Sequence, residues 1–428
     1  MAKLWQKDKT IINKIVEKYT VGDDYLFDVN LLPYDFQASL VHAQGLNKIG
    51  ILSKVELKKI KNGLNNLKSD WEKGKIKISI EDEDCHTFIE NYLVEKIGSV
   101  GKKIHTGRSR NDQVLVALRL YVKEKAKQIN VVTLKICKIL KLKIKNFQNI
   151  PMVGYSHMQP AMLSSVGHYL SAHLESLLDD IAFTNIVLKH LDKSPLGSAA
   201  GFGVNLPLDR EFVAKELGFS GVQINSLYCQ NSKGKFESIY LESIVQIMMT
   251  LGRFANDLLI FTMNEFQYFS INESLTTGSS IMPQKKNLDV LELVRANCKV
   301  VINNQLLVKN LVIGLLSGYN RDTQLMKKPI IESTNIILDS LQVMQLVIED
   351  LVPNKKQFES KIPVEILAAD KALELVKTKK ITFRDAYKQA LDLLPEEKVD
   401  WSAELKKKIS LGSAGNLGLK YYLKRLPN

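Results

Sequence analysis

The most constraining feature of this 428-residue chain is the distribution of its eleven prolines. They leave three long stretches, 34–150, 208–282 and 284–328, without any proline. Because proline in a helix interior removes a hydrogen bond and costs about 3 kcal/mol, these stretches have room for long uninterrupted helices. The chain is also long enough to bury a large core, and we expect more than one packing unit.

Apolar residues recur at three- and four-residue steps, which places them on one face of a helix. Three such stripes are Leu163, Val166, Leu170, Leu174, Leu177, Ile181 and Leu188; Ile244, Met248, Leu251, Ala255, Leu258 and Thr262; and Leu291, Val294, Cys298, Val301 and Val308. Thr184 and Gln305 interrupt the first and third stripes. Strand-like alternation is scarce, apart from the short stretch 76–80. The pattern predicts an all-α fold with helices of about 30 residues, each about 45 Å long.

Helices of this length are difficult for a single chain to cover on every side. A bundle shared between subunits buries them, so the sequence favours an oligomer. Along the chain we expect a mixed helical N-terminal domain over 1–106, a central long-helix bundle over 107–352 and a small helical C-terminal domain over 353–428.

The net charge of +13 raises the question of a nucleic-acid partner. The lysines, however, are spread along the chain among Ile, Leu and Asn, as in 141–146, which is typical of solvated helix faces. No nucleic-acid-binding motif accompanies them. We therefore expect no nucleic-acid partner, although a basic field can help to gather a polyanionic metabolite.

Nothing in the sequence predicts secretion or membrane insertion. No run of about 18 apolar residues is present, and the N-terminus becomes charged at once. The cysteines, Cys85, Cys137, Cys229 and Cys298, lie far apart and match no metal-binding or disulfide pattern. We expect reduced core thiols, no metal site, no membrane partner and a cytoplasmic location.

Two polar loops carry side chains that bind anions or transfer protons. Segment 105–113 contains two arginines, two hydroxyls and two amides just before a predicted helix, which suits a carboxylate. Its plainer interpretation is a polar turn with an aspartate cap. In segment 154–161, His157 suits proton transfer near neutral pH, and we expect Pro160 to end the loop and begin the long helix. The alternative is a structural histidine.

A third loop, 276–287, is rich in glycine, serine and threonine and is followed by another predicted helix. Ser279 could act as a base only after losing its proton, which requires nearby positive charge such as Lys285 or backbone N–H groups. A basic surface loop is the plainer interpretation. The three loops are far apart in sequence but each adjoins a long helix, so a bundle can bring them together.

Several segments also resemble the motifs of one enzyme family. GSSIMPQKKN at 278–287 resembles the signature loop of the fumarase/aspartase superfamily, and its QKKN ending is similar to argininosuccinate lyase. HTGRSRNDQV at 105–114 resembles the argininosuccinate lyase form of the first conserved loop. Further matching segments are SHMQPA (156–161), PLGSAAGFG (195–203), LELVRA (291–296), SGYNRDTQLMKK (317–328), AADKALELV (368–376) and ITFRDAY (381–387). The resemblance covers nearly the whole chain.

This resemblance implies the three-domain all-α superfamily fold, with a central bundle shared between subunits. The implied reaction is the reversible β-elimination of argininosuccinate to L-arginine and fumarate, the last step of arginine biosynthesis. The family is a homotetramer in which each active site draws on three subunits. The implied partner is the small-molecule substrate, and we expect neither a metal nor an organic cofactor.

The resemblance also implies roles for individual residues. Ser279 would take the Cβ proton, and His157, paired with Glu292, would serve the second proton transfer, either as an acid or through water. Lys285 and Asn287 would hold the carboxylate on which charge gathers as the carbanion forms. The other implied substrate-binding residues are Arg110, Asn111, Ser156, Tyr319, Gln324, Lys327 and His86, with Tyr319 and Gln324 on the arginine side.

The chain departs from the family pattern at several places. The N-terminal Leu-Trp-Gly-Gly-Arg-Phe is replaced by LWQKDK at 4–9, and the substrate-binding serine that follows has no match near 21–24. The common Ser-x-Arg-Asp loop is replaced by NSKGK at 231–235, so its helpful arginine has no direct match. Leu288 replaces a common proline, and Tyr387 a common histidine. These departures concern the arginine side and the rate rather than the reaction type.

Three alternatives compete with this interpretation. Another fumarate-producing lyase, such as adenylosuccinate lyase, fumarase or aspartase, is disfavoured by HTGRSRNDQV. An inactive structural relative, as some lens crystallins of this family are, is disfavoured because the four implied catalytic residues are retained together. A nucleic-acid-binding protein has only the net charge in its favour.

Overall fold

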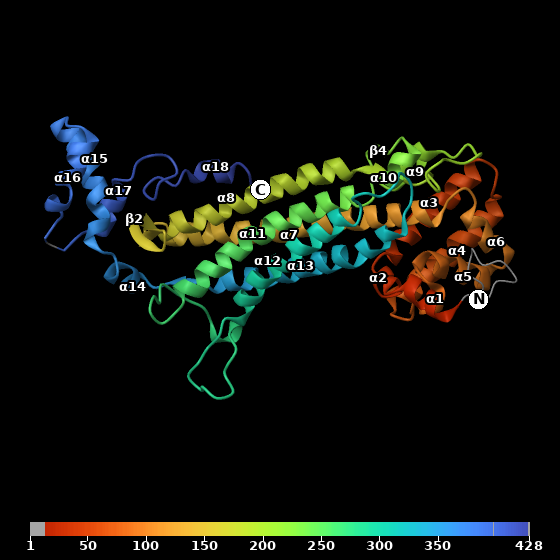
Figure 1. Cartoon of the computed structure of the whole chain (residues 1–428), viewed down its shortest axis with the longest axis horizontal. Helices are drawn as coiled ribbons and strands as arrows, with labels where there is room; N and C mark the ends of the chain where they lie inside the picture. Colours follow the sequence, from red (N-terminus) through yellow and green to blue (C-terminus); the bar gives the residue numbers. More distant parts are fainter. Residues whose placement is uncertain (1–12, 397, 427–428) are drawn as a thin grey trace. The chain divides into compact units, whose positions relative to one another are not determined.

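The structure is a computed structural model, of which residues 13–396 and 398–426 are described. Within them the chain folds mainly into helices, with three small two-stranded sheets (Figure 1). The predicted all-α class is therefore confirmed. The N-terminal departure at 4–9 lies outside the described residues.

The chain forms two compact units, each assembled from three segments. The first contains Met1–Gln128, Phe183–Val245 and Val300–Ile337, and the second contains Ile129–Ala182, Gln246–Lys299 and Leu338–Asn428. Five long helices contribute to both units: α7 (Arg110–Phe147), α8 (Val166–Leu191), α11 (Lys235–Phe261), α12 (Asp289–Asn310) and α13 (Lys327–Asp350). The units therefore cut across the three domains expected along the chain, and that division stays a prediction.

The long helices follow the apolar stripes of the sequence. α8, α11 and α12 have 26, 27 and 22 residues, somewhat shorter than expected. Most stripe residues are buried, including Leu174, Ile244 and Leu291. The two polar interruptions are buried too, and the Gln305 amide donates a hydrogen bond to the Ser238 carbonyl at 3.4 Å. Polar side chains on the stripe are thus accommodated by hydrogen bonds within the core.

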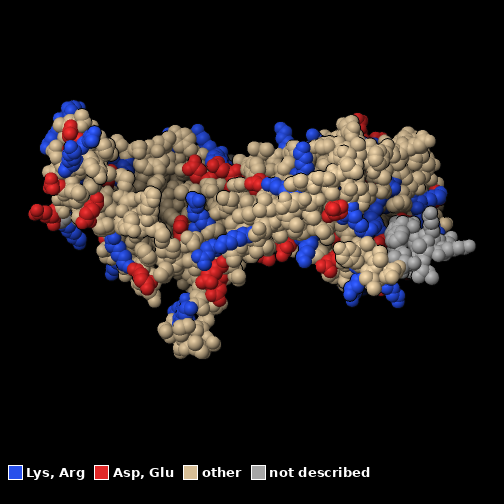
Figure 2. Space-filling model, viewed as in Figure 1, with Lys and Arg blue, Asp and Glu red and all other residues tan. Residues whose placement is uncertain are grey.

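One helical segment, Ser226–Phe261, is long and apolar enough to cross a membrane by length and composition alone. Its stripe residues Ile244, Met248 and Leu251 are fully buried in the protein. A core helix meets the same criteria, so the segment is weak evidence for a membrane span. On the face drawn in Figure 2, Lys and Arg side chains are interspersed with Asp and Glu rather than gathered in one patch.

The remaining elements of the first unit are shorter than the five long helices. Its helices are α1 (Lys14–Val21), α2 (Asp24–Asp28), α3 (Leu32–Lys48), α4 (Lys54–Glu72), α5 (Cys85–Ile97), α6 (Ser99–Lys102), α9 (Arg210–Glu216) and α10 (Ser226–Asn231). Its 3-10 helices are η1 (Ile80–Asp82), η2 (Lys103–His105) and η4 (Arg321–Met326). β3 (Lys193–Ser194) and β4 (Gly221–Val222) pair in parallel.

The second unit contains a hairpin and the C-terminal helices. Its helices are α14 (Lys355–Ser360), α15 (Ala368–Lys379), α16 (Phe383–Gln389), α17 (Trp401–Lys406) and α18 (Leu419–Leu423), with 3-10 helices η3 (Glu273–Leu275), η5 (Val364–Leu367) and η6 (Leu391–Leu393). β1 (Pro151–Ser156) pairs antiparallel with β2 (Gln159–Ser165), and β5 (Phe269–Ser270) with β6 (Val352–Pro353). The C-terminal region is helical, as predicted.

The segment around Pro160 corrects the sequence prediction. Pro160 does not begin the long helix; it lies in β2, and α8 begins at Val166. A proline is tolerated there because a two-stranded sheet has only edge strands. Leu163 belongs to β2 as well, and its burial comes from packing with Val153 and Leu367 rather than from a helix face.

Two smaller expectations have different outcomes. The alternating stretch 76–80 forms no strand; only Ile78 is buried, and Ile80 begins η1. All four cysteines are free thiols, three of them buried, whereas Cys298 is half-buried.

The β1–β2 turn is built from two residues in the left-handed region. His157 has φ of 51° and Met158 has φ of 61°. A two-residue hairpin loop needs positive φ at both positions, which normally selects Asn and Gly. Side chains with a Cβ cost on the order of 1–2 kcal/mol there, so this turn stores strain at its tip.

We predict that Met158→Gly raises the free energy of unfolding by about 1 kcal/mol, because it removes this strain. Met158 is 83% exposed, so little packing is lost. Urea unfolding at fixed protein concentration measures the change. Met162→Gly, in the neighbouring strand, is the matched control and should destabilise. An equal loss in both variants would contradict the strain.

Candidate active site

The predicted site residues fall into two sets, one in each unit. The first set is His86, Arg110, Asn111, Tyr319, Gln324 and Lys327, and the second is Ser156, His157, Ser279, Lys285, Asn287 and Glu292.

His86 lies in the first turn of α5, buried in the first unit. Asp84 fixes the start of this helix, because its carboxylate accepts a hydrogen bond from the Thr87 N–H at 2.8 Å. The His86 Nδ1 lies 2.5 Å from the Asp35 carboxylate. Burial alone would lower the pKa of His86, but the Asp35 carboxylate outweighs it and the pKa is raised. A protonated His86 is therefore part of a buried ion pair.

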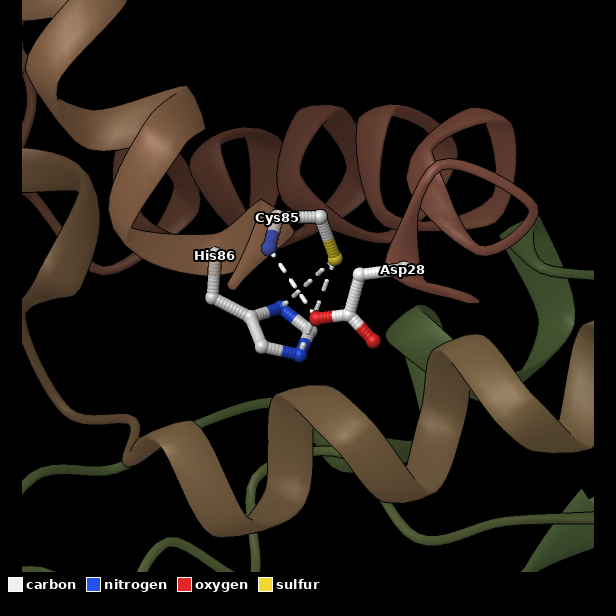
Figure 3. A group of neighbouring side chains, drawn as sticks. All are labelled: Asp28, Cys85 and His86. Carbon is white, nitrogen blue, oxygen red and sulfur yellow. Dashed lines mark hydrogen bonds between the residues drawn. The ribbon is translucent and has the colours of Figure 1, made fainter. Parts of the chain in front are cut away.

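Asp28, Cys85 and His86 lie close enough together to be considered as metal ligands (Figure 3). Protein groups already occupy their donor atoms. The two Asp28 oxygens accept hydrogen bonds from the Cys85 N–H and the Lys327 ammonium, and His86 pairs with Asp35. Burial also raises the pKa of the Cys85 thiol well above its usual value, which disfavours the thiolate that binds metals. The chemistry of this trio fits an ion-paired core better than a metal site.

Arg110 and Asn111 lie on the first turn of α7, which begins at Arg110, a few residues earlier than expected, inside the segment 105–113 that was predicted to precede the helix. The Ser109 N–H donates a hydrogen bond to Asp112 Oδ1 at 2.8 Å, and the Asn111 N–H donates to Ser109 Oγ at 3.3 Å. The aspartate cap of the plainer interpretation is thus present. The helix dipole makes this turn favourable for an anion as well.

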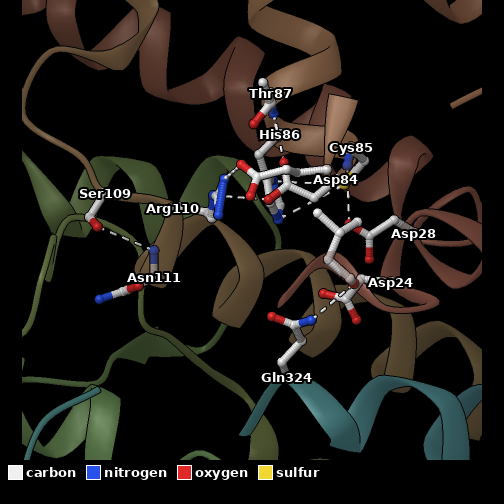
Figure 4. Close-up of polar contacts among 12 residues, drawn as sticks. Asp24, Asp28, Asp84, Cys85, His86, Thr87, Ser109, Arg110, Asn111 and Gln324 are labelled. Atoms are coloured by element: carbon white, nitrogen blue, oxygen red, sulfur yellow. Dashed lines mark hydrogen bonds and ion pairs between the residues drawn. The ribbon is translucent and has the colours of Figure 1, made fainter. Parts of the chain in front are cut away.

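The Arg110 guanidinium is held between two carboxylates. Its Nε lies 2.9 Å from Asp84 Oδ2, and a terminal nitrogen lies 2.7 Å from Glu83 Oε2 (Figure 4). The side chain remains 27% exposed. The two acids fix its orientation, and its exposed part is available to a substrate.

Lys327 is buried at the start of α13 and joins two acids of α2. Its ammonium donates hydrogen bonds to Asp24 at 2.9 Å and to Asp28 at 2.7 Å. Burial opposes its charge, but the two carboxylates prevail and raise its pKa. Lys327 is therefore fully engaged within the chain, and its implied contact with substrate stays a prediction.

Gln324 and Tyr319 precede α13. The Gln324 amide donates hydrogen bonds to the Thr20 and Val21 carbonyls, at 3.0 and 3.1 Å, at the end of α1. Tyr319 is 40% exposed, and the Lys233 ammonium lies 5.2 Å from its ring centroid. Figure 4 shows Gln324 in the same close-up as Asp24, Arg110 and Asn111, so the first unit gathers these residues from distant segments.

In the second unit, Ser156 and His157 occupy the tip of the β1–β2 hairpin. Ser156 ends β1 opposite Gln159, and His157 is the first of the two strained turn residues. Both side chains are exposed. Backbone strain of this kind often marks a functional position. Asn or Gly would relieve the strain in a turn with no other role.

The loop between η3 and α12 contains three further residues of the second set. Thr277 and Asn287 close it by exchanging two backbone hydrogen bonds of 2.9 Å. Inside the loop, Ser279 Oγ accepts hydrogen bonds from the N–H groups of Met282, at 3.2 Å, and Ile281, at 3.4 Å. Donors aimed at an oxygen stabilise negative charge on it, so the loop favours a serine alkoxide.

Lys285 and Glu292 present free charged side chains. Both are exposed, and within the described part of the chain neither side chain forms a hydrogen bond or an ion pair. The same is true of the His157 ring. The implied pair of His157 and Glu292 is thus not formed within one chain and stays a prediction.

Sequence reasoning missed the acids that organise the first set. These are Asp24, Asp28, Asp35, Glu83 and Asp84. The acidic run that precedes His86 in the sequence was the available signal, since buried arginine and lysine side chains require carboxylate partners.

A family model described as lyase matches residues 10–303, which is more than half of the chain, so the chain belongs to a lyase family. The argininosuccinate lyase of Thermotoga neapolitana is 45% identical over 396 residues, covering 92% of this chain and 99% of that protein. The argininosuccinate lyase of Sorangium cellulosum is 40% identical, covering 99% and 98%. The chain belongs to the argininosuccinate lyase family.

Solved structures show the same architecture. EDDS lyase in complex with formate matches with a TM-score of 0.80 and 21% identity, covering 95% of this chain and 88% of that one. Class II fumarase from Schistosoma mansoni matches with a TM-score of 0.75 and 16% identity, covering 90% and 94%. At these identities the likeness shows the fold alone, and it confirms the superfamily fold expected from the sequence.

The raised pKa of His86 predicts a specific dependence of stability on pH. Above pH 6.5, its ordinary pKa, the unfolded chain releases this proton and the folded protein keeps it. The contribution of His86 is therefore complete below pH 6.5 and is lost as the pH rises through the folded pKa. The free energy of unfolding of the wild type, minus that of His86→Gln, should fall by up to about 1.4 kcal/mol per pH unit.

Urea unfolding of both proteins between about pH 6 and pH 9 measures this difference. Subtraction cancels other histidines such as His42, whose pKa burial lowers to about 3. A difference that stays constant or grows with pH would show that the folded protein does not retain the proton.

Proposed function

We propose that this protein catalyses the reversible β-elimination of argininosuccinate to L-arginine and fumarate, the last step of arginine biosynthesis. The observation that carries the proposal is the environment of Ser279. Its oxygen accepts two backbone N–H groups in a loop that also presents an unpaired Lys285. The names of the similar proteins supply the substrate.

The first step is proton removal from carbon. Ser279, as an alkoxide, takes a proton from the Cβ of the succinyl group, and the electron pair of that C–H bond passes into the adjacent carboxylate. Lys285 and Asn287 hold this carboxylate, so their attraction is strongest when its charge is greatest. The electron pair then forms the double bond of fumarate as the carbon–nitrogen bond breaks.

The second proton goes to the nitrogen that leaves with arginine. His157 supplies it, directly or through water, and Glu292 from another subunit orients the ring and raises its basicity. The exposure of both side chains in a single chain is compatible with this arrangement. Ser156, beside His157, contributes a hydroxyl to the succinyl side.

The first set binds both parts of the substrate, with Arg110 and Asn111 on the succinyl side. Arg110 and Asn111 present cationic and amide groups at the N-terminus of α7, which suits a carboxylate. Tyr319 and Gln324 line the arginine side. Lys327 and His86 are both buried in ion pairs. They hold the substrate-binding residues of the first set in place through the acids that they bind.

We further propose that the protein is a homotetramer whose sites are shared between subunits. The long helices expose large apolar side chains in the single chain, which supports burial against other copies. These are Ile186 on α8, Met249 on α11, Leu293, Leu306 and Leu307 on α12, and Leu346 on α13. The two sets can then meet across subunit boundaries.

The expected setting follows from the sequence. We propose a cytoplasmic location, a small-molecule substrate, and no nucleic-acid or membrane partner. The interspersed charges of Figure 2 support the absence of a nucleic-acid surface on the face drawn. The reaction as proposed uses protein groups for both proton transfers and for charge stabilisation.

Ser279→Ala should raise the activation barrier by at least about 3 kcal/mol, a loss of roughly 100-fold or more in rate. The alkoxide is lost while the loop backbone stays closed. The assay follows fumarate absorbance on addition of argininosuccinate. Ser280→Ala, in the same loop, is the matched control and should retain activity. Full activity of Ser279→Ala would remove this serine from its role.

The same assay separates the alternatives. Wild-type protein should release fumarate from argininosuccinate and not from adenylosuccinate, malate or aspartate. Release from adenylosuccinate alone would replace the proposed substrate. Light scattering should give the mass of four chains for the wild type and for Ser279→Ala; a monomeric mass would contradict the shared site.

A further inference from the structure

The loop that departs from the family pattern carries a buried lysine. Counted from Ser232, Gly234 stands where the family has arginine. Gly234 has φ of +82°, and a Cβ there would lie 2.4 Å from a methyl group of Val312, so a larger side chain does not fit. Lys233, directly before it, is only 6% exposed. The positively charged side chain that this loop buries is therefore Lys233.

The Lys233 ammonium has no hydrogen-bond acceptor among the described residues. It lies over the face of the Tyr319 ring, with the Nζ atom 5.2 Å from the ring centroid. Burial and then the charge of Lys327 lower its pKa to about 8, so it remains mostly protonated at neutral pH. Nearly buried and without an acceptor of its own in the described chain, this ammonium is available to an anion that enters the site.

The nearby carboxylates are already committed to other donors. Asp24 and Asp28 both bind the Lys327 ammonium. Glu237 accepts a hydrogen bond from the Gly234 N–H at 2.5 Å. These acids attract Lys233 from a distance without neutralising it by direct contact. The local geometry thus provides a lysine that an added anion would satisfy.

We propose that Lys233 binds the α-carboxylate of the arginine part of the substrate. This inference rests on the proposed function. Lys233 lies against Tyr319, on the side expected for arginine, and a lysine binds a carboxylate as a point charge. The α-ammonium group of the same amino acid would find negative charge at Asp24, whose Oδ2 alone accepts the Lys327 hydrogen bond. Lys233 and Asp24 together match the two charges of an amino-acid end.

Two ligands that differ by one group test this assignment. L-Arginine carries the α-carboxylate, and agmatine is the same molecule without it. Calorimetric titration should show that wild-type protein binds arginine at least about tenfold more tightly than agmatine. Lys233→Met should weaken the binding of arginine by about the same factor and leave the affinity for agmatine unchanged, because only the carboxylate contact is removed.

Lys235→Met is the matched control, since Lys235 is an exposed lysine of the same loop. It should bind both ligands as the wild type does. The assignment would be overturned if Lys233→Met still bound arginine more tightly than agmatine. It would also be overturned if the variant lost affinity for both ligands equally. Failure of wild-type protein to release fumarate from argininosuccinate would instead reject the proposed function, so the two failures are distinguishable.

Discussion

The first unit depends on the compensation of one buried charge, the Lys327 ammonium. Its two hydrogen bonds tie the start of α13 to α2, and Asp28 uses its other oxygen to bind the N–H of Cys85 at the start of α5. Removal of one partner from such a pair leaves an unpaired buried charge, which costs about 3–5 kcal/mol. Arg110 pairs with Asp84, the residue before Cys85. Gln324 lies three residues before Lys327, so these substrate-binding candidates stand next to the stabilising contacts along the chain.

The second unit follows a different principle, because its functional groups are exposed. His157 sits on a strained turn, and Ser279 lies in a loop closed by the Thr277–Asn287 pair. Strain and exposure are costs that a folded chain tolerates where another surface completes the site. The first unit thus offers substrate-binding groups set among paired charges. The second unit offers proton-transfer groups that have no partners of their own.

Much of the fold was predictable from the sequence, because proline-free apolar stripes determine long helices almost directly. The start of α8 was not, since Leu163 fits a helical stripe equally well when it is buried by a hairpin. The acids around Lys327 and His86 were also missed, because pairing of buried charges depends on contacts between distant segments. Motif resemblance identified residues such as Asn111 and Ser279, but spacing alone does not reveal that Lys233 is buried.

The central claim is that a complete site needs one set of residues from each of two or more chains. The most direct measurement mixes two inactive variants, Ser279→Ala in the second set and Asn111→Ala in the first, and assays the hybrid oligomers for fumarate release. Shared sites predict that activity returns, because some sites then receive both native sets. Hybrid oligomers that form, as judged by native mass spectrometry, yet stay as inactive as their parents would contradict the claim.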